Sequence, residues 1–512
     1  MSLLDDRLSR LGAHRLQGIR RGIEKESLRS LPGGGLARTP HPAALGSSLT
    51  HPHITTDYCE AQLELITGVH AGVQDCLDEL TRVHQYTYRT LADERYGIGN
   101  EQLWVGSMPC GLPPDENIIT GTYGTSNIAR AKSVYRMGLG HRYGRRMQTI
   151  SGIHYNWSMP GLSNDEHFAL IRNFRRHAFL LLALFGASPA VCPSFVEGRD
   201  HGLQRLSEDT LYLPHATSLR MGRLGYQSDA QASLAVSYNS LESYAASLHE
   251  ALTRPYPPYE AIGIKNLGGE YNQLSTTLLQ IENEFYGTIR PKRVIRPGER
   301  PLHALLERGV EYIEVRCMDL DPFVPVGIQA QTIRFLDIFL LHCLLADSPR
   351  DTPAEIAELG RNQHRAASHG REPGLTLERH GRPVLLCDWA AELLADLAPI
   401  AQALDNAHGT LDYSESLSVA RDGIAAPDTL PSARVLATMA GDFGGSYTAL
   451  ICAQSQATHS QLLALPWSPE QQAAFEAMAQ LSTAERAALE AADSMDFETY
   501  RLAYLSPDRL LA

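Results

Sequence analysis

Alternating polar and apolar residues predict β-strands in four stretches of the chain. The stretches are residues 22–29 (GIEKESLR), 55–67 (TTDYCEAQLELIT), 280–286 (QIENEFY) and 311–321 (EYIEVRCMDLD). Side chains of residues i and i+2 in a strand point to the same face. Each stretch therefore places charged side chains, mostly carboxylates, next to one another on one face. The pattern predicts a sheet with an acid-rich face.

A fifth strand and two long helices are predicted between these stretches. Residues 151–160 (SGIHYNWSMP) alternate cleanly between polar and apolar positions, which is typical of a strand. Residues 71–95 and 165–187 instead repeat their apolar side chains at helical spacing, and the second segment is apolar enough to be buried. We therefore expect helices to pack against the sheet.

The pattern changes after Phe323, where the chain becomes rich in Ala, Leu, Glu and Gln at helical spacing. No low-complexity tract, internal repeat or convincing linker separates this part from the rest. We expect an α+β fold in which residues 1–512 form a single catalytic unit. Its sheet-bearing core occupies residues 1–330, and residues 331–512 form a mainly helical C-terminal part.

Composition and charge narrow the class of protein. Hydrophobic residues make up 43% of the 512 residues and charged residues 20%, which is ordinary for a soluble enzyme, and the net charge of −13 argues against a general nucleic-acid binder. Eight cysteines without a C-x-x-C pair suggest neither a zinc site nor a disulfide framework. The N-terminus lacks a signal-peptide core, and the longest apolar run, residues 178–187, is too short to cross a bilayer. We expect a cytoplasmic protein without membrane association.

The predicted strands carry acidic side chains that share a face: Glu24, Glu26, Glu60, Glu64, Glu282, Glu284 and Glu314. So many carboxylates repel one another unless a cation lies among them, and hard oxygen-rich sites suit Mg²⁺ together with nucleotide phosphates. An isolated acidic pair is usually a solvated strand edge. Four such segments instead favour a clustered site, and the chemistry it suggests is phosphoryl transfer.

Two side chains near these acids have more than one interpretation. His154 shares its strand face with Asn156 and Ser158, so it is either a metal ligand or a core histidine bonded to the backbone. Arg316 lies two residues from Glu314. The two form either a site for an anion beside a metal or a simple cross-strand ion pair.

Other candidate groups carry less information. The basic run in residues 290–300 (RPKRVIRPGER) includes Lys292 and Arg293 and either clamps nucleotide phosphates or is a solvated loop. Arg220 and Tyr226, six residues apart, could hold a substrate carboxylate. No P-loop, zincin or α/β-hydrolase motif occurs, so phosphate binding by a P-loop is excluded.

At these same residues the chain resembles the glutamate–cysteine ligases of proteobacteria, which catalyse the first step of glutathione synthesis. The matching stretches include GIEKESLR, YGTSNIARAKSVYRMGLGHRYG, MQTISGIHYNWSMP, YLPHATSLRMGRLGY, LQIENEFYGTIRPKR and GVEYIEVRCMDLDPF. The resemblance fades after about Leu377, in the C-terminal helices. The length fits a stand-alone ligase without the ATP-grasp domain of fused enzymes.

The resemblance implies a fold and a reaction. The fold would be similar to the catalytic domain of glutamine synthetase and guanidino kinases, a curved and mostly antiparallel sheet with helices outside. ATP would phosphorylate the γ-carboxylate of glutamate, and the amine of cysteine would then displace phosphate to give γ-glutamylcysteine. The implied cofactor is Mg²⁺ or Mn²⁺, with ATP as co-substrate.

The resemblance also assigns roles to residues of this chain. The implied metal ligands are Glu24, Glu26, Asp57, Glu60, Glu64, His154 and Glu314. The implied substrate-binding residues are Arg220, Tyr226, Tyr286, Tyr123, Asn127 and Arg316. Among these, Arg220, Tyr226 and Tyr286 would hold the cysteine carboxylate. Arg316, acting beside Glu314, would stabilise the transferring phosphoryl group or bind glutamate.

Two other functions stay open at this point. The same fold and ATP chemistry could serve a different acceptor amine or make a phosphagen. A catalytically silent metabolite-binding protein is the third hypothesis, but it predicts the loss of at least one metal-site acid, and none is missing. We expect small-molecule substrates only, a monomer or weak oligomer, and, by resemblance, feedback inhibition by glutathione.

Overall fold

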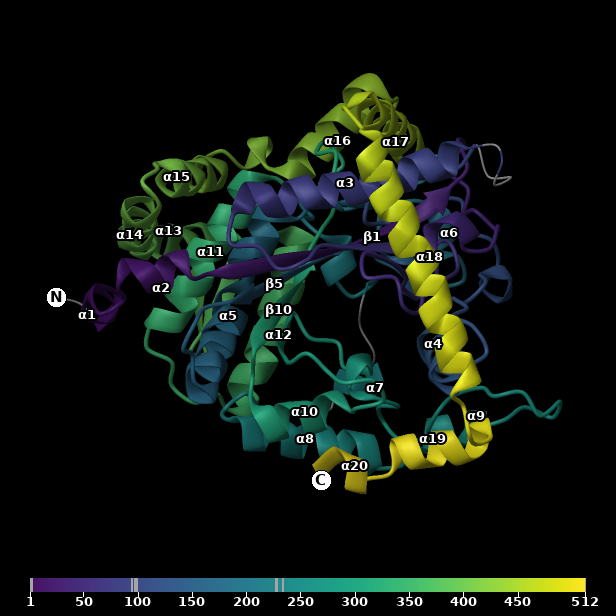
Figure 1. The fold of residues 1–512 in the computed structure, drawn as a ribbon. Helices are drawn as coiled ribbons and strands as arrows, with labels where there is room; N and C mark the ends of the chain where they lie inside the picture. The colour runs from purple at the N-terminus through teal and green to yellow at the C-terminus, as the bar shows by residue number, and fades with distance from the viewer. Residues whose placement is uncertain (1–2, 94, 96–99, 226–228, 233, 512) are drawn as a thin grey trace.

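A central antiparallel sheet crosses the molecule, and helices from both parts of the chain surround it (Figure 1). The computed structural model describes residues 3–93, 95, 100–225, 229–232 and 234–511. The α+β class and the helical C-terminal part that the sequence predicts are both confirmed. The organisation of residues 1–512 as one catalytic unit stays a prediction.

Seven strands form the central sheet. In spatial order they are β2 (Ile54–Thr56), β3 (Gln62–Ile66), β1 (Arg20–Ser30), β5 (Ile153–Ser158), β10 (Tyr312–Met318) and β9 (Ile289–Lys292), with β4 (Gln102–Leu103) paired to the end of β1. All of these pairs are antiparallel. Strands therefore lie in the predicted stretches 22–29, 55–67, 151–160 and 311–321.

Two small antiparallel sheets lie outside the central one. The first has the order β6 (Ala190–Val191), β8 (Thr210–Tyr212) and β7 (Gln204–Ser207). The second is the hairpin of β11 (Thr376–Arg379) and β12 (Arg382–Leu385).

Helices fill the connections between strands and nearly all of the C-terminal part. The described helices that precede residue 330 are α1 (Leu3–Ser9), α2 (Ala13–Gln17), α3 (Val73–Ala92), α4 (Asn127–Tyr143), α5 (Asn164–Phe185), α6 (Pro193–Val196), α7 (Asp229–Ala232), α8 (Leu241–Thr253), α9 (Pro257–Ile262) and α10 (Pro301–Arg308). They are followed by α11 (Ala330–Leu345), α12 (Pro353–His369), α13 (Leu386–Asp396), α14 (Ala398–His408), α15 (Asp412–Ala425), α16 (Pro431–Asp442), α17 (Tyr447–Ala464), α18 (Pro469–Ala491), α19 (Phe497–Leu505) and α20 (Asp508–Leu511). Among the described residues, no helix has both the length and the apolar character needed to cross a membrane.

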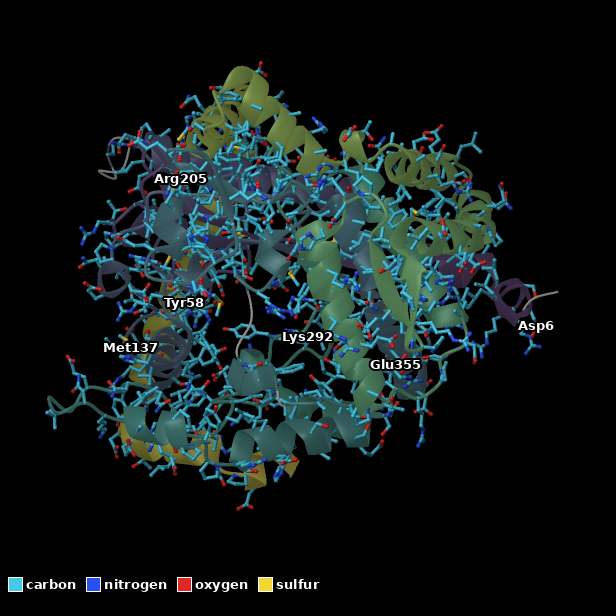
Figure 2. The ribbon with its side chains drawn as sticks, turned by 180° about the vertical axis from the view of Figure 1, so that it is seen from behind. Asp6, Tyr58, Met137, Arg205, Lys292 and Glu355 are labelled. Atoms are coloured by element: carbon cyan, nitrogen blue, oxygen red, sulfur yellow. The ribbon has the colours of Figure 1, made fainter. Side chains whose placement is uncertain are left out.

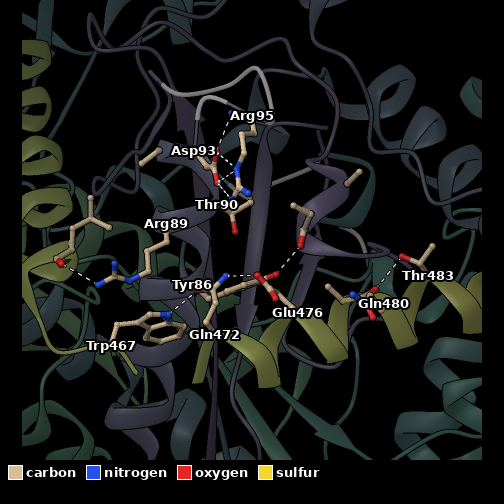
Figure 3. Close-up of a pocket in the computed structure, with 15 residues that line it drawn as sticks. Tyr86, Arg89, Thr90, Asp93, Arg95, Trp467, Gln472, Glu476, Gln480 and Thr483 are labelled. Carbon is tan, nitrogen blue, oxygen red and sulfur yellow. Dashed lines mark hydrogen bonds and ion pairs between the residues drawn. The ribbon is translucent and has the colours of Figure 1, made fainter. Parts of the chain in front are cut away.

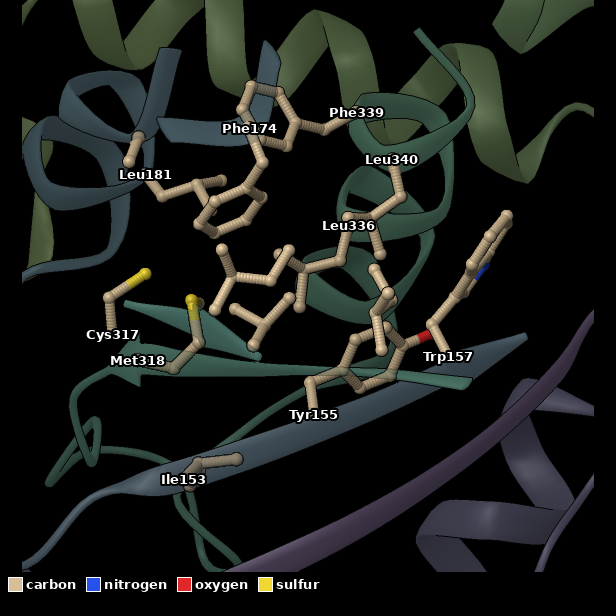
Figure 4. Close-up of a cluster of buried hydrophobic side chains, with 14 of the residues drawn as sticks. Ile153, Tyr155, Trp157, Phe174, Leu181, Cys317, Met318, Leu336, Phe339 and Leu340 are labelled. Carbon is tan, nitrogen blue, oxygen red and sulfur yellow. The ribbon is translucent and has the colours of Figure 1, made fainter. Parts of the chain in front are cut away.

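The apolar face of the central sheet packs against α3, α5 and α11. Alternate strand residues such as Ile23, Tyr155 and Val315 have no exposed surface. Figure 4 shows Tyr155 beneath side chains of α5 and α11, where the rings of Phe174 and Phe339 meet edge to face with centroids 5.7 Å apart. Burial of this face holds the strands in register and leaves their other side chains facing the polar side.

The C-terminal helices extend around the sheet-bearing core. In Figure 1 the long helix α18 runs from the top of the molecule, near α17, toward α19 and α20 at the bottom. There α19 contacts α4, and α20 contacts α10. The last helices of the chain therefore pack against helices of the sheet-bearing core.

One predicted strand is wrong. Residues 280–286 form a single 3-10 turn, Glu282–Glu284, instead of a strand of the sheet. Glu282 forms a buried ion pair with Arg300 at 2.7 Å, and Glu284 forms one with Arg142 at 2.8 Å. A second oxygen of Glu284 accepts the backbone N–H of Gln280, which closes the loop on itself. These two carboxylates are balanced by arginines and do not join the acidic strands.

Candidate active site

The polar face of the central sheet brings together most of the predicted site residues. We call the following set the acidic face: Glu24 and Glu26 of β1, Glu64 of β3, His154 and Asn156 of β5, Glu314 and Arg316 of β10, and Lys292 of β9. In the strand register Glu24 is paired with His154, Glu26 with Glu64, and Glu314 with Asn156. Directly paired residues of antiparallel strands share a face, so register alone gathers acids from distant segments.

Glu24, Glu64 and His154 form the tightest group of possible metal ligands on this face. One ligand atom from each of the three lies within 4.8 Å of the others. Nδ1 of His154 is 3.3 Å from Glu24, and its Nε2 is 3.8 Å from Glu26. Asn156 donates a 2.8 Å hydrogen bond to the other oxygen of Glu24. Carboxylate oxygens with one imidazole are a donor set that suits Mg²⁺ or Mn²⁺.

The neighbouring cationic side chains do not fully balance the negative charge of Glu24, Glu26 and Glu64. Burial raises the pKa of Glu64 well above its usual value, and the charges of Glu24, Asp57 and Glu26 raise it further. Burial, with the charge of Asp57, raises the pKa of Glu26 to about 8. Burial also opposes ionisation of Glu24, but its hydrogen bond with His154 lowers the pKa of that carboxyl. A bound divalent cation would let all three acids ionise.

At the β10 end of the acidic face, the negative charge of the carboxylate is balanced by two cationic side chains. Arg316 donates a 2.9 Å hydrogen bond to Glu314, and Nζ of Lys292 lies 3.1 Å from the other oxygen of the same carboxylate. Burial opposes ionisation of Glu314, but Lys292 and Arg316 hold its pKa well below the usual range. Figure 2, which shows the molecule from behind, labels Lys292 near its centre. Two cations thus lie beside the acidic cluster, where they can hold an anion.

A register shift in β10 helps to place Arg316. The pairing with β5 shifts between Val315 and Met318, so three steps along β10 match two along β5. Such bulges redirect side chains, and they are common next to active sites. Here Nη1 of Arg316 lies 3.5 Å from Nδ1 of His154, between the acidic cluster and Glu314.

A second group of predicted residues borders the acidic face. Asp57 follows β2, and its carboxylate lies 3.9 Å from Arg136 of α4. The hydroxyl of Tyr123 lies 2.7 and 2.6 Å from the carbonyl oxygens of Thr56 and Asp57, so it is held by the backbone. Arg136 and Lys132 both lie over the Tyr123 ring, 4.6 and 4.7 Å from its centroid.

Sequence reasoning overlooked Lys132 and Arg136. The charge of Lys132 favours the ionised form of Glu64, although burial lowers the pKa of Lys132 to about 8, and the carboxylates of Asp57 and Glu64 raise the pKa of Arg136. They lie four residues apart on α4, which puts them on one helix face. That i, i+4 spacing was the available signal, and a search for strand alternation cannot detect it.

Three predicted site residues point elsewhere. The carboxylate of Glu60, in the turn before β3, accepts the backbone N–H groups of His41 and Thr122 at 2.8 Å each. Asn127 begins α4 and donates to Asp493 and Met495 of the C-terminal part at 2.6 and 3.0 Å. Arg293 donates to the carbonyl oxygens of Arg308 and Gly309 beyond the end of β9. In each case these contacts occupy the polar group away from the acidic cluster.

The described contacts do not bring together all of the residues expected to hold a substrate carboxylate. Arg220 is 1% exposed, donates to the carbonyl of Arg316 at 2.9 Å and lies 3.8 Å from Asp319. The hydroxyl of Tyr286 accepts a 2.7 Å hydrogen bond from Gln148. Tyr226 lies outside the described residues.

A cavity of about 1060 Å³ lies away from this chemistry, between α3 and α18 (Figure 3). Several of its polar side chains pair with one another, as Asp93 does with Arg95, and as Gln472 does with Glu476. None of the predicted site residues lines it. The acidic face is therefore the better candidate, on chemistry rather than on size.

Comparisons with known proteins agree on one family. The model of the glutamate-cysteine ligase family matches residues 7–366. A glutamate–cysteine ligase from Azotobacter vinelandii is 48% identical, and one from Pseudomonas aeruginosa 47% identical, each over 98% of both chains.

Two solved structures also resemble this chain. One is a glutamate–cysteine ligase from Francisella tularensis in complex with AMP, with a TM-score of 0.89 at 34% identity over 95% of this chain and 97% of that one. The other is a bifunctional glutathione synthetase from Pasteurella multocida, with a TM-score of 0.70 at 25% identity over 93% of this chain and 57% of that one.

Proposed function

This chain belongs to the glutamate–cysteine ligase family, and we propose that its acidic face binds the metal and substrates for ATP-dependent ligation of glutamate to cysteine. The observation that carries the proposal is the juxtaposition of two sites on one sheet face. Glu24, Glu64 and His154 lie close enough to form a cation site, and Arg316 with Lys292 would form an anion site next to it. A metal-bound nucleotide phosphate needs both.

The donor set fits Mg²⁺ or Mn²⁺. Three carboxylates and one imidazole are hard or borderline ligands, and burial together with the neighbouring carboxylates raises the pKa values of Glu26 and Glu64. Glu24, Glu26, Glu64 and His154 would hold the metal, with Asp57 and Glu314 at the border of the site. When bound, the ion would neutralise charge on the phosphates of ATP.

The side chains would act mainly by position and charge. In the proposed reaction an oxygen of the glutamate γ-carboxylate attacks the γ-phosphorus of ATP and ADP leaves. The cysteine amine then attacks the acyl carbon, phosphate leaves, and the nitrogen loses a proton to solvent as the amide forms. Arg316 offers a planar fork that Glu314 orients at 2.9 Å, and such a fork matches phosphoryl or carboxylate oxygens.

Nucleotide use is supported by the AMP complex of the Francisella relative. We propose that ATP phosphates reach the acidic face beside Lys292, and that Arg220, Tyr226 and Tyr286 hold the cysteine carboxylate. For Arg220 this requires a change of partners, because its guanidinium is buried against Asp319 and the Arg316 carbonyl. Tyr123 would act by positioning Asp57 through the backbone.

We propose that the protein acts in the cytoplasm as a monomer or weak oligomer and that glutathione inhibits it. Sedimentation of the purified chain would test whether it is a monomer or a weak oligomer. Inhibition of turnover by added glutathione would test the proposed feedback.

The decisive experiment measures ADP release by purified protein with Mg²⁺, ATP and glutamate, with and without cysteine. We expect strong stimulation by cysteine and γ-glutamylcysteine in the mass spectrum. Stimulation by a different amine would move the acceptor, and no ADP release with any amine would overturn the proposal.

A matched pair of variants tests the metal site within the same assay. Glu64→Gln should raise the Mg²⁺ concentration needed for turnover, since it removes a ligand from the cluster. Glu60→Gln should leave that requirement unchanged, because the Glu60 carboxylate already binds backbone N–H groups. An equal effect of both variants would contradict the assignment.

A further inference from the structure

Two histidines and a cysteine meet between α5 and α11, outside the acidic face. His177 belongs to α5, and His342 and Cys343 are adjacent in α11. One ligand atom from each residue lies within 4.8 Å of the other two, and the imidazole centroids are 5.6 Å apart. His342 is 3% exposed, Cys343 is fully buried and His177 is half-buried.

The two imidazoles carry unpaired polar atoms. Within the described part of the chain, Nδ1 of His177 and Nδ1 of His342 are both buried without a hydrogen-bond partner. Buried polar atoms are nearly always paired in folded proteins, so two orphaned nitrogens in one cluster call for an explanation. A bound ion would supply the missing partner to both.

We propose that His177, His342 and Cys343 bind a thiophilic divalent cation of the zinc class. Imidazole nitrogen and thiolate sulfur are the ligands that zinc prefers, whereas the acidic face offers mainly oxygen. Binding releases the Cys343 thiol proton to solvent, and the sulfur then bonds the ion as a thiolate. A water reaching the half-buried His177 completes four-coordination.

The three side chains need to move only a short distance toward one another to bind an ion. Tetrahedral zinc places its nitrogen and sulfur ligands roughly 3.3–3.6 Å from one another, so from separations within 4.8 Å the ligand atoms must approach by at most about 1.5 Å. Rotation of the imidazoles can provide this within fixed helices. The ligands come from two helices without C-x-x-C spacing, which is why the sequence indicated no zinc site. The bound ion would tie α5 to α11 behind the strands of the sheet.

Another possible cluster is weaker. Glu299, His303 and Glu307 also lie within range of one another. Both carboxylates already bind Arg308, at 2.7 Å for Glu299. Among the described residues, no arginine or lysine bonds directly to the three side chains on α5 and α11, and the charges of Arg176 and Arg379 act on His177 only from a distance.

Cobalt substitution tests the site independently of the proposed function. Metal-free protein in excess Mg²⁺ is titrated with Co²⁺, and thiolate ligation is read from charge-transfer absorption in the near ultraviolet. The acidic face has no cysteine and cannot produce this band. We expect saturation at one equivalent, loss of the band in Cys343→Ser and an unchanged band in Cys387→Ser, which removes an exposed thiol.

A second variant keeps the test decisive if Cys343→Ser fails to fold. His177→Phe retains the thiol and should weaken Co²⁺ binding by at least the roughly 100-fold that losing a supporting interaction can cost. Zn²⁺ should raise the Tm of the wild type and of Cys387→Ser, but not that of His177→Phe. Absence of the band, or a band that survives Cys343→Ser or keeps full affinity in His177→Phe, would overturn the proposal.

Discussion

Replacing Lys25 by methionine should stabilise the protein, because the ammonium of this lysine is buried on the apolar side of the sheet. Lys25 lies between two residues of the acidic face but is 1% exposed on the opposite side of β1. Its chain packs near Gly327, and its Nζ donates a 2.7 Å hydrogen bond to Ser27. Within the described residues no carboxylate forms an ion pair with it.

The magnitude follows from the pKa of Lys25. Burial lowers this pKa from 10.5 to about 7. Between these values the unfolded chain binds more protons than the folded one, so stability rises with pH across this window. At 1.36 kcal/mol per pH unit, the buried charge costs on the order of 5 kcal/mol at pH 6 and almost nothing above pH 10.5. Methionine keeps the apolar contacts and removes the charge.

Urea unfolding of both proteins at pH 6, 8 and 10 measures the effect. The stability gained by Lys25→Met should be largest at pH 6 and should shrink steadily toward pH 10. Lys265→Met is the matched control, since its side chain is 43% exposed and its 3.8 Å contact with Glu498 is worth at most about 1 kcal/mol. A gain that does not change with pH, or a loss of stability, would refute the reasoning.

Three further predictions concern the acids and the site. Glu284→Gln should lower the free energy of unfolding by roughly 3–5 kcal/mol in urea, because it leaves the buried guanidinium of Arg142 without its anion; an unchanged midpoint would contradict this. Arg316→Lys should lower kcat by about 100-fold or more with an unchanged circular dichroism spectrum, since lysine lacks the fork; a variant with normal kcat would make Arg316 structural. Chelation by EDTA should abolish ADP release and added Mg²⁺ should restore it, and turnover that resists EDTA would exclude the metal.

The strands around the site could be predicted because burial of one sheet face imposes a strict period of two. In residues 151–160 the apolar positions Tyr155 and Trp157 are buried, and His154 and Asn156 lie on the other face. The same rule predicted that Glu24 and Glu26 are neighbours. Their proximity to Glu64 and Glu314 depends on the order of the strands in the sheet. Alternation within a single strand gives no information about that order.

The same rule failed where charge pairing decides the conformation. Residues 280–286 alternate like a strand, yet Glu282 and Glu284 bind Arg300 and Arg142 in a 3-10 turn. Glu60 follows the spacing of the acidic strand, but β3 begins only at Gln62. Partners distant in sequence determine these cases, and a local pattern carries no information about them.

The core and the acidic face are linked through strand register. A one-residue slip of β5 would turn His154 into the core and Tyr155 and Trp157 onto the polar face. Each large apolar side chain lost from the core costs about 1.5–3 kcal/mol, so the apolar residues set the register. The acids repel one another and would by themselves oppose this pairing. The side chains of the proposed site are therefore positioned by the opposite, apolar face of the sheet.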